Sequence, residues 1–188
     1  MKIVLVGTTA ACVLGFRADL IKTLVERGDQ VFAFALDFDD DTRAKVRALG
    51  ALPVDYVFSR AGLNPLGDII TTYKLVKLLM AIAPDIVFSY FSKPVIFGTL
   101  AAVMAGVKRR IGMLEGLGYV FTERPNGKTF KGRLLKFIQV FLYRISFPFL
   151  ERLIFLNKDD PIDMVEKHKI KVSKVSVLAG IGMDLSNY

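Results

Sequence analysis

Short apolar runs rich in Val, Ile and Phe alternate along the chain with longer segments of helical periodicity. Six of these runs predict β-strands, and they span 2–6, 30–35, 85–90, 109–113, 152–156 and 174–178. Their near-continuous hydrophobicity is typical of parallel strands that are buried on both faces of a sheet.

The segments between the runs predict helices. Phe16, Leu20 and Leu24 indicate one amphipathic helix between the first two strands, and Gly28 is placed to end it. Further helices are predicted at 40–49, 65–82, 93–105, 131–147 and 159–167. The alternation of strands and helices predicts an α/β fold, a Rossmann-like, doubly wound, mainly parallel sheet with helices on both faces.

Composition removes several classes of protein. With 188 residues, of which 53% are hydrophobic and 23% charged, the chain is not a disordered tail. The single cysteine, Cys12, excludes a disulfide scaffold. Met1 leads directly into a strand, so no secretory leader is expected, and the apolar stretch 94–107 is shorter than the roughly 20 residues of a membrane span.

The net charge of +8 is concentrated in one part of the chain. Residues 108–152 hold ten basic and three acidic side chains, a net +7, which leaves +1 for all other positions. A positive balance indicates an anionic partner such as phosphate or a membrane surface. Its local concentration favours one anionic site over a nucleic-acid-binding surface.

The first turn lacks a nucleotide fingerprint, because Gly7 and Gly15 stand eight apart with no third glycine and no Walker lysine. NAD and ATP are therefore disfavoured, and with them a nicotinamide-dependent reductase. Arg17 is expected in the first turn of the predicted helix, where a cation opposes the helix dipole. An anionic ligand at that helix start would explain it, and a solvated arginine is the alternative.

Two further strands end in polar residues. Lys93 precedes Pro94 at the start of a predicted helix, which makes it either a phosphate ligand or an ordinary exposed lysine. Glu115 follows the next strand and precedes two glycines, Gly116 and Gly118. It is the candidate catalytic residue, able to orient a sugar hydroxyl or to act as a base. Because no partner acid is visible, positioning is favoured over proton transfer.

No metal site is expected. The only histidine, His168, lies in a lysine run and gives neither a metal cluster nor a catalytic triad. The aspartates at 37, 39, 40 and 41 lack the spacing of a calcium loop and are explained by a helix start.

The segment 131–149 is apolar around most of its circumference. Its narrow polar stripe consists of Arg133, Lys136, Gln139, Tyr143 and Ser146. Such a helix either packs between the sheet and solvent or lies in a membrane interface, with cations at the headgroups. The basic residues proposed to contact a membrane or phosphates are Arg124, Lys128, Lys131, Arg133 and Lys136.

Taken in order, several short motifs resemble the N-terminal domain of family 4 glycosyltransferases with the GT-B fold. These are Phe16-Arg17 with Gly28-Asp29, Lys93-Pro94, Gly-Leu-Gly-Tyr-Val-Phe at 116–121, Asn157 with Asp159-Asp160, and Gly-Ile-Gly-Met-Asp at 180–184. The likeness is greatest to bacterial enzymes that extend sugars on a polyprenyl-diphosphate carrier. One departure is Ala179 before Gly180, where the family usually has proline.

This resemblance implies the N-terminal half of a GT-B fold, with an acceptor-binding domain at 1–178 and the start of an interdomain linker at 179–188. It implies a retaining transfer of a hexose or N-acetylhexosamine from a nucleotide sugar to a lipid-linked glycan in cell-surface polysaccharide or glycan synthesis. The nucleotide sugar would bind a C-terminal domain that these 188 residues lack, so this portion alone is expected to be inactive. The implied substrate-binding residues are Phe16, Arg17, Lys93, Glu115, Gly116, Leu117, Gly118 and Tyr119.

The expected partners are the nucleotide sugar, the lipid-linked acceptor and an anionic membrane surface, without nucleic acid or a cofactor. The expected location is cytoplasmic, peripheral on the inner face of the plasma membrane. A non-catalytic, membrane-associated subunit of a split glycosyltransferase is the alternative.

Overall fold

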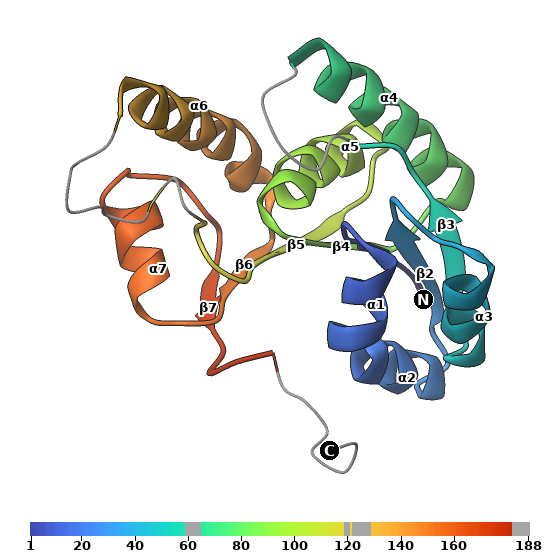
Figure 1. The fold of residues 1–188 in the computed structure, drawn as a ribbon. Helices are drawn as coiled ribbons and strands as arrows, with labels where there is room; N and C mark the ends of the chain where they lie inside the picture. Colours follow the sequence, from blue (N-terminus) through green and yellow to red (C-terminus); the bar gives the residue numbers. More distant parts are fainter. Residues whose placement is uncertain (59–64, 119–120, 122–128, 182–188) are drawn as a thin grey trace.

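Seven parallel strands form one sheet in the order β3-β2-β1-β4-β5-β6-β7 (Figure 1). The structure, a computed structural model, describes residues 1–58, 65–118, 121 and 129–181. The strands are β1 (Lys2–Val6), β2 (Gln30–Ala35), β3 (Leu52–Asp55), β4 (Ile86–Tyr90), β5 (Arg109–Leu114), β6 (Arg152–Phe155) and β7 (Val175–Val177). The predicted fold class is confirmed, and the six predicted strands are present.

The strand that sequence analysis missed is β3. It is four residues long, carries Pro53, and pairs with β2 at the edge of the sheet. Leu52 is 43% exposed, so the run lacks the continuous burial of the other strands. An edge strand tolerates proline because one side of its backbone has no ladder to complete.

Helices cover both faces of the sheet. They are α1 (Ala10–Phe16), α2 (Ala18–Glu26), α3 (Asp40–Ala48), α4 (Pro65–Ile82), α5 (Thr99–Met104), α6 (Phe130–Ser146) and the short α7 (Asp159–Pro161). A π-helical turn, η1 (Pro94–Gly98), leads into α5, a 3₁₀ turn, η2 (Phe147–Phe149), follows α6, and another π-helical turn, η3 (Ile162–Glu166), follows α7.

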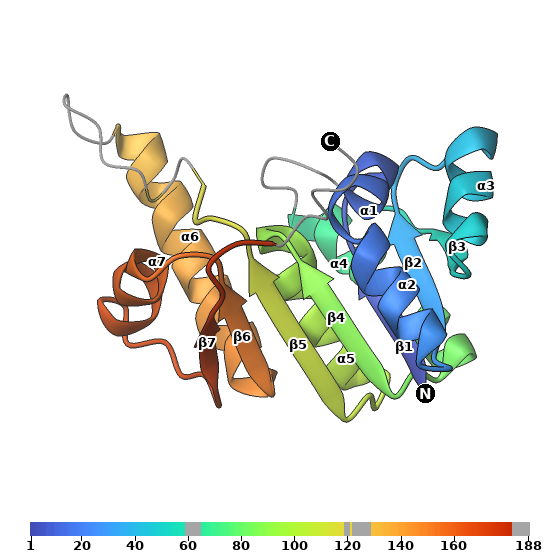
Figure 2. The same cartoon turned by 90° about the horizontal axis from the view of Figure 1, so that it is seen from below.

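The sheet divides the core because successive side chains of a strand point to opposite faces. Ile3 and Leu5 of β1 pack in one cluster with residues of α1, α2 and α3. Val4 and Val6 of the same strand pack in another with residues of α4 and α5. Parallel crossovers are right-handed, so the helices change face where the strand order reverses between β1 and β4. Figure 2 shows α1, α2 and α3 on the near face and α4, α5 and α6 behind.

The single helix predicted between β1 and β2 is in fact two helices. The backbone at Arg17 has φ −125° and ψ −1°, away from helical values, and separates α1 from α2. The amide of Arg17 still donates to the Val13 carbonyl and thereby closes α1. As predicted, Gly28 lies just past the end of α2, with a φ of +87° that favours glycine.

The turn after β1 requires a glycine for steric reasons. A Cβ at Gly7 would overlap the ring of Tyr90, which is fully buried. The Gly7 carbonyl also accepts a hydrogen bond from the Tyr56 hydroxyl. This turn is therefore packed between two tyrosines.

We predict that Gly7→Ala lowers the free energy of unfolding by about 1–3 kcal/mol, because the buried ring cannot move aside without displacing its neighbours. Gly15→Ala is the matched control, since a Cβ there meets nothing within 4 Å. That change should raise stability by about 0.5–1 kcal/mol through helix propensity. Urea unfolding followed by circular dichroism measures both, and equal effects of the two variants would contradict the steric argument.

Candidate functional site

Three sequence-predicted site residues come to the carboxyl edge of the sheet. Glu115 directly follows β5, Lys93 follows β4, and Arg17 lies at the break between α1 and α2. Open α/β sheets bind ligands at this edge, close to the point where the strand order reverses. Here the reversal falls between β1 and β4.

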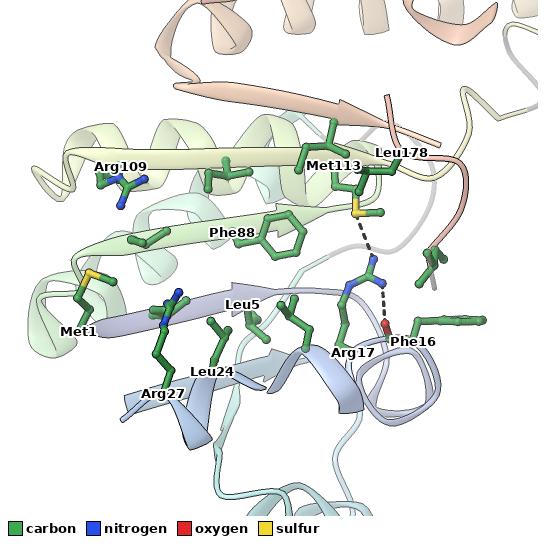
Figure 3. Close-up of a pocket in the computed structure, with 16 residues that line it drawn as sticks. Met1, Leu5, Phe16, Arg17, Leu24, Arg27, Phe88, Arg109, Met113 and Leu178 are labelled. Atoms are coloured by element: carbon green, nitrogen blue, oxygen red, sulfur yellow. Dashed lines mark hydrogen bonds between the residues drawn. The ribbon is translucent and has the colours of Figure 1, made fainter. Parts of the chain in front are cut away.

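Arg17 and Glu115 form an ion pair. Arg17 Nη2 donates to Glu115 Oε1, although the two residues are 98 positions apart in the chain. The Arg17 side chain is 2% exposed and that of Glu115 13%. Arg17 also donates to the Phe16 carbonyl at 2.8 Å and to Met113 Sδ at 3.7 Å, as Figure 3 shows.

The guanidinium of Arg17 lies over the aromatic ring of Tyr90. The centroid of that ring lies 4.3 Å from the Arg17 Cζ, within cation–π distance. Burial raises the pKa of the Tyr90 phenol, and the positive charge of Arg17 offsets only part of that rise. The phenol therefore stays neutral at physiological pH, and the ring holds Arg17 without neutralising its charge. Sequence analysis missed Tyr90, since it reads as one more apolar strand residue.

The structure places Arg17 at the N-cap of α2, with its side chain buried against a carboxylate of the chain itself. It is therefore not the solvated arginine of the alternative prediction, and its binding of an external anion stays a prediction. Two amides at the start of α1 already donate to side chains of the chain itself. The Ala10 amide donates to Asp37 Oδ1 at 2.7 Å, and the Cys12 amide donates to Thr9 Oγ1 at 3.2 Å.

Glu115 can contact a ligand while it is paired. One carboxylate oxygen serves Arg17, and the partial exposure of the side chain leaves the other available to a hydroxyl donor. The neighbouring Gly116 and Gly118 are exposed, so this part of the loop lies at the surface without side chains beside the carboxylate. Leu117 is 7% exposed and packs in the core cluster beneath α6, where it anchors this loop. Tyr119 lies outside the described residues.

Lys93 has a carboxylate partner of its own. Its Nζ donates to both oxygens of Asp68, at 3.0 and 3.1 Å, and lies 5.3 Å from the centroid of Phe58. Asp68 is 4% exposed and belongs to the first turn of α4. A phosphate that binds Lys93 would have to compete with Asp68 for its ammonium group. Lys93 is therefore not the ordinary exposed lysine of the sequence-based alternative, and its role as a phosphate ligand stays a prediction.

A pocket of about 450 Å³ lies along the open half of the near face (Figure 3). Its floor is apolar and includes Leu5, Phe88 and Met113 from three neighbouring strands. Phe16, 43% exposed, and Arg17 line it at the carboxyl edge, so the pocket adjoins the Arg17–Glu115 pair. Leu20 and Leu24 of α2 line one side of it, whereas no helix among the described residues covers β4 and β5 on this face (Figure 2).

The helix α6 buries only part of its apolar surface. Val140 and Tyr143 pack in the core and Ser146 is fully buried, whereas Phe137 and Phe141 are 69% and 54% exposed. Inside, the hydroxyl of Tyr143 accepts from Gln139 at 2.6 Å and that of Ser146 donates to the Leu142 carbonyl at 2.9 Å. Apolar residues therefore face outward, which favours the interfacial alternative for this helix.

Three of the five predicted membrane-contact residues belong to α6, and two lie outside the described residues. Lys131 and Arg133 are exposed on α6, and Lys136 lies with its Nζ 4.8 Å from the centroid of Phe121. Arg124 and Lys128 lie outside the described residues. In the described ranges no helix is long and apolar enough to cross a bilayer, and no group of three potential metal ligands occurs.

Comparison with known proteins gives a relative that matches the chain from end to end. It is the N,N'-diacetylbacillosaminyl-diphospho-undecaprenol alpha-1,3-N-acetylgalactosaminyltransferase of Campylobacter jejuni, 31% identical over all 188 residues. The resemblance to bacterial polyprenyl-diphosphate-linked glycosyltransferases is confirmed. No protein-family model matches the chain.

Solved structures show the same fold at low identity. The Anabaena protein HepE, crystallised with UDP and glucose, superimposes on the whole chain with a TM-score of 0.66 and 13% identity. A glycosyltransferase from Rickettsia africae covers 94% of the chain with a TM-score of 0.63 and 13% identity. The chain accordingly has the Rossmann-like fold found in GT-B glycosyltransferases.

The matches also limit what the fold alone decides. The chain spans 48% of the length of the curated relative, and 46% and 42% of the two solved chains. A UDP-GlcNAc 2-epimerase from Neisseria meningitidis shares the fold with a TM-score of 0.60 and 14% identity. The fold therefore does not choose between transfer and epimerisation.

The ion pair predicts an asymmetric effect of its two halves on stability. Glu115→Ala should lower the free energy of unfolding by about 3 kcal/mol, because it leaves the more deeply buried charge, that of Arg17, without a counter-ion. Arg17→Met should cost less, since methionine fills the aliphatic space and the remaining carboxylate can turn toward water. Chemical unfolding of both variants tests this order, and a larger loss for Arg17→Met would contradict it.

Proposed function

We propose that the chain is the acceptor-side domain of a retaining glycosyltransferase that moves a hexose or N-acetylhexosamine from a nucleotide sugar to a polyprenyl-diphosphate-linked glycan. The 31% identity with the Campylobacter enzyme over all 188 residues carries this proposal, because the name of that relative specifies a sugar transfer to a diphospho-undecaprenol acceptor. The position of Glu115 at the ligand-binding edge of the sheet supports it.

The transfer breaks the bond between the anomeric carbon of the donor sugar and its phosphate oxygen, and the nucleoside diphosphate leaves with the electron pair. The hydroxyl oxygen of the acceptor forms the new bond to that carbon on the same face, and its proton is released. In this proposal Glu115 accepts a hydrogen bond from an acceptor hydroxyl and orients it. Arg17, held by Tyr90, is a positioning residue that fixes the carboxylate.

The nucleotide sugar would bind a second domain of the kind that completes the relatives' length. In this proposal the protein binds its acceptor at the cytoplasmic face of the plasma membrane, and α6 binds peripherally to that membrane. The exposed phenylalanines of α6 and its flanking cations Lys131 and Arg133 support that location. Each cation near an anionic surface contributes about 1 kcal/mol.

The proposal predicts that Glu115→Gln lowers kcat/KM for sugar transfer by about 10- to 100-fold, because a misoriented acceptor loses the proximity advantage. The variant is made in the longer protein that carries the second domain, and transfer from UDP-sugars to undecaprenyl-diphosphate-linked monosaccharides is measured. Glutamine retains an oxygen acceptor for Arg17, so the pair's geometry is largely kept.

Glu151→Gln is the matched control. Glu151 also pairs with an arginine, since its Oε2 lies 3.0 Å from Nε of Arg109, but this pair is at the amino edge of the sheet. The Glu151→Gln variant should therefore have the wild-type kcat/KM for transfer. Wild-type kcat/KM in Glu115→Gln would refute the role of this carboxylate. A wild-type protein that binds the lipid-linked sugar without transferring to it would instead support the non-catalytic subunit of a split enzyme.

A further inference from the structure

Phe91 has a backbone conformation that its residue type disfavours. Its φ is +70°, in the left-handed region, where a bulky side chain is an outlier. The other non-glycine residues with a positive φ in the described ranges are Ala83 and Lys169, which follow helical segments, where a left-handed residue commonly ends the helix. Phe91 instead follows a strand, β4, at the carboxyl edge of the sheet. Strained residues of this kind cluster at ligand-binding sites.

The left-handed backbone changes the face on which the ring lies. Side chains of β4 alternate, so that Phe88 and Tyr90 pack in the cluster of the near face, whereas Val87 packs in a cluster of the far face. Continued alternation would place the side chain of Phe91 on the far face. It packs instead against the near-face cluster. Two successive aromatic side chains therefore lie on the same face of the sheet.

The turn that Phe91 forms does not require an aromatic ring. The Phe91 amide donates to the Met113 carbonyl at 3.2 Å, and its carbonyl accepts from the Val95 amide at 2.9 Å. Glycine would make both hydrogen bonds without strain. The Phe91 side chain is also partly exposed, whereas that of Tyr90 is fully buried. The core therefore uses only part of the Phe91 ring, and the remainder is accessible to a ligand.

The ring lies close to the candidate site. The Phe91 amide bonds to Met113 of β5, and Glu115 follows Met113 by two residues. Arg17 contacts the side chains of both Met113 and Glu115, so these two share the near face. Tyr90 completes the link, since its ring centroid is 5.4 Å from that of Phe91 and 4.3 Å from the Cζ of Arg17. An aromatic face and a carboxylate therefore adjoin one another at the carboxyl edge.

A sugar ring presents groups that match both. Its hydroxyls donate hydrogen bonds, and its C–H groups form an apolar face that suits the negative face of an aromatic ring. We propose that the Phe91 ring packs against the C–H face of the acceptor sugar, while Glu115 accepts from a hydroxyl of the same sugar. This inference rests on the proposed function for the identity of the acceptor, and it makes Phe91 a specificity-determining residue.

Tryptophan fluorescence tests the contact directly, because the chain has no tryptophan of its own. The Phe91→Trp variant keeps an aromatic face at the site and adds a single fluorophore. The probe is a short-chain prenyl diphosphate that carries one N-acetylglucosamine, and the same prenyl diphosphate without the sugar is the comparison. We expect a saturable change in emission with the sugar-bearing probe and little change with the sugar-free one.

Phe38→Trp is the matched control. Phe38 is also partly exposed and packs against the same core cluster, but it lies in the loop after β2, which β1 separates from β4. Its ring centroid is 5.7 Å from the Cζ of Arg43, away from the site. The emission of the Phe38→Trp variant should not change with either probe.

Phe91→Leu gives a second measurement, by calorimetric titration of the purified chain with the same two probes. Leucine keeps apolar volume against the core but lacks a flat ring, so the dissociation constant of the sugar-bearing probe should rise about tenfold. The affinity for the sugar-free probe should not change. Phe91→Tyr retains the ring and should bind the sugar-bearing probe as wild type does.

Four results would overturn the inference. They are an emission of the Phe91→Trp variant that does not change, an equal response to the two probes, a wild-type affinity of the Phe91→Leu variant, and a wild-type chain whose binding does not depend on the sugar. If the Phe91→Trp variant fails to fold, the titration of Phe91→Leu decides alone. Because these are binding measurements, sugar-dependent binding through Phe91 in a protein that transfers no sugar would support this contact and refute only the transfer.

Discussion

The reversal of strand order between β1 and β4 is the constraint on which the rest of the molecule depends. Since every crossover is right-handed, that reversal sends α1, α2 and α3 to one face and the later helices to the other. Because the strands are all parallel, the loops after β1, β4 and β5 lie at one edge, and the connections after β1 and β4 leave it toward opposite faces. Arg17 and Glu115, far apart in the chain, meet there because the topology leaves both at the same edge.

The elements that were predicted correctly are those whose local pattern agrees with their environment. Apolar runs buried on both faces read as parallel strands, and Gly28 read as the end of a helix because its backbone needs a positive φ. The predictions failed where the environment overrides the pattern. Because Pro53 argues against a strand, the edge strand β3 was not predicted. Because the apolar periodicity continues through Phe16 and Leu20, one helix was predicted where the backbone at Arg17 separates two.

Sequence analysis predicts where the candidate site residues lie but not what they contact. Arg17, Lys93 and Glu115 do lie near the carboxyl edge of the sheet, whereas their partners follow from the fold and their roles toward a ligand stay predictions. Asp68 reaches Lys93 across 25 positions, and Glu115 reaches Arg17 across 98, so no local spacing records either pair. The orientation of α6 was equally beyond sequence periodicity. A helix with apolar residues on most sides can pack on the domain with any of several faces. The face that is buried follows from the packing of Tyr143 against Phe147 of η2 and the surrounding core.

The contact between Gly7 and Tyr90 has an evolutionary consequence. Any side chain at position 7 would demand a smaller one at position 90, yet a smaller residue at position 90 would remove the ring beneath Arg17 and loosen its hold on Glu115. The four positions are thus coupled through one ring. Drift at any one of them is limited by the other three.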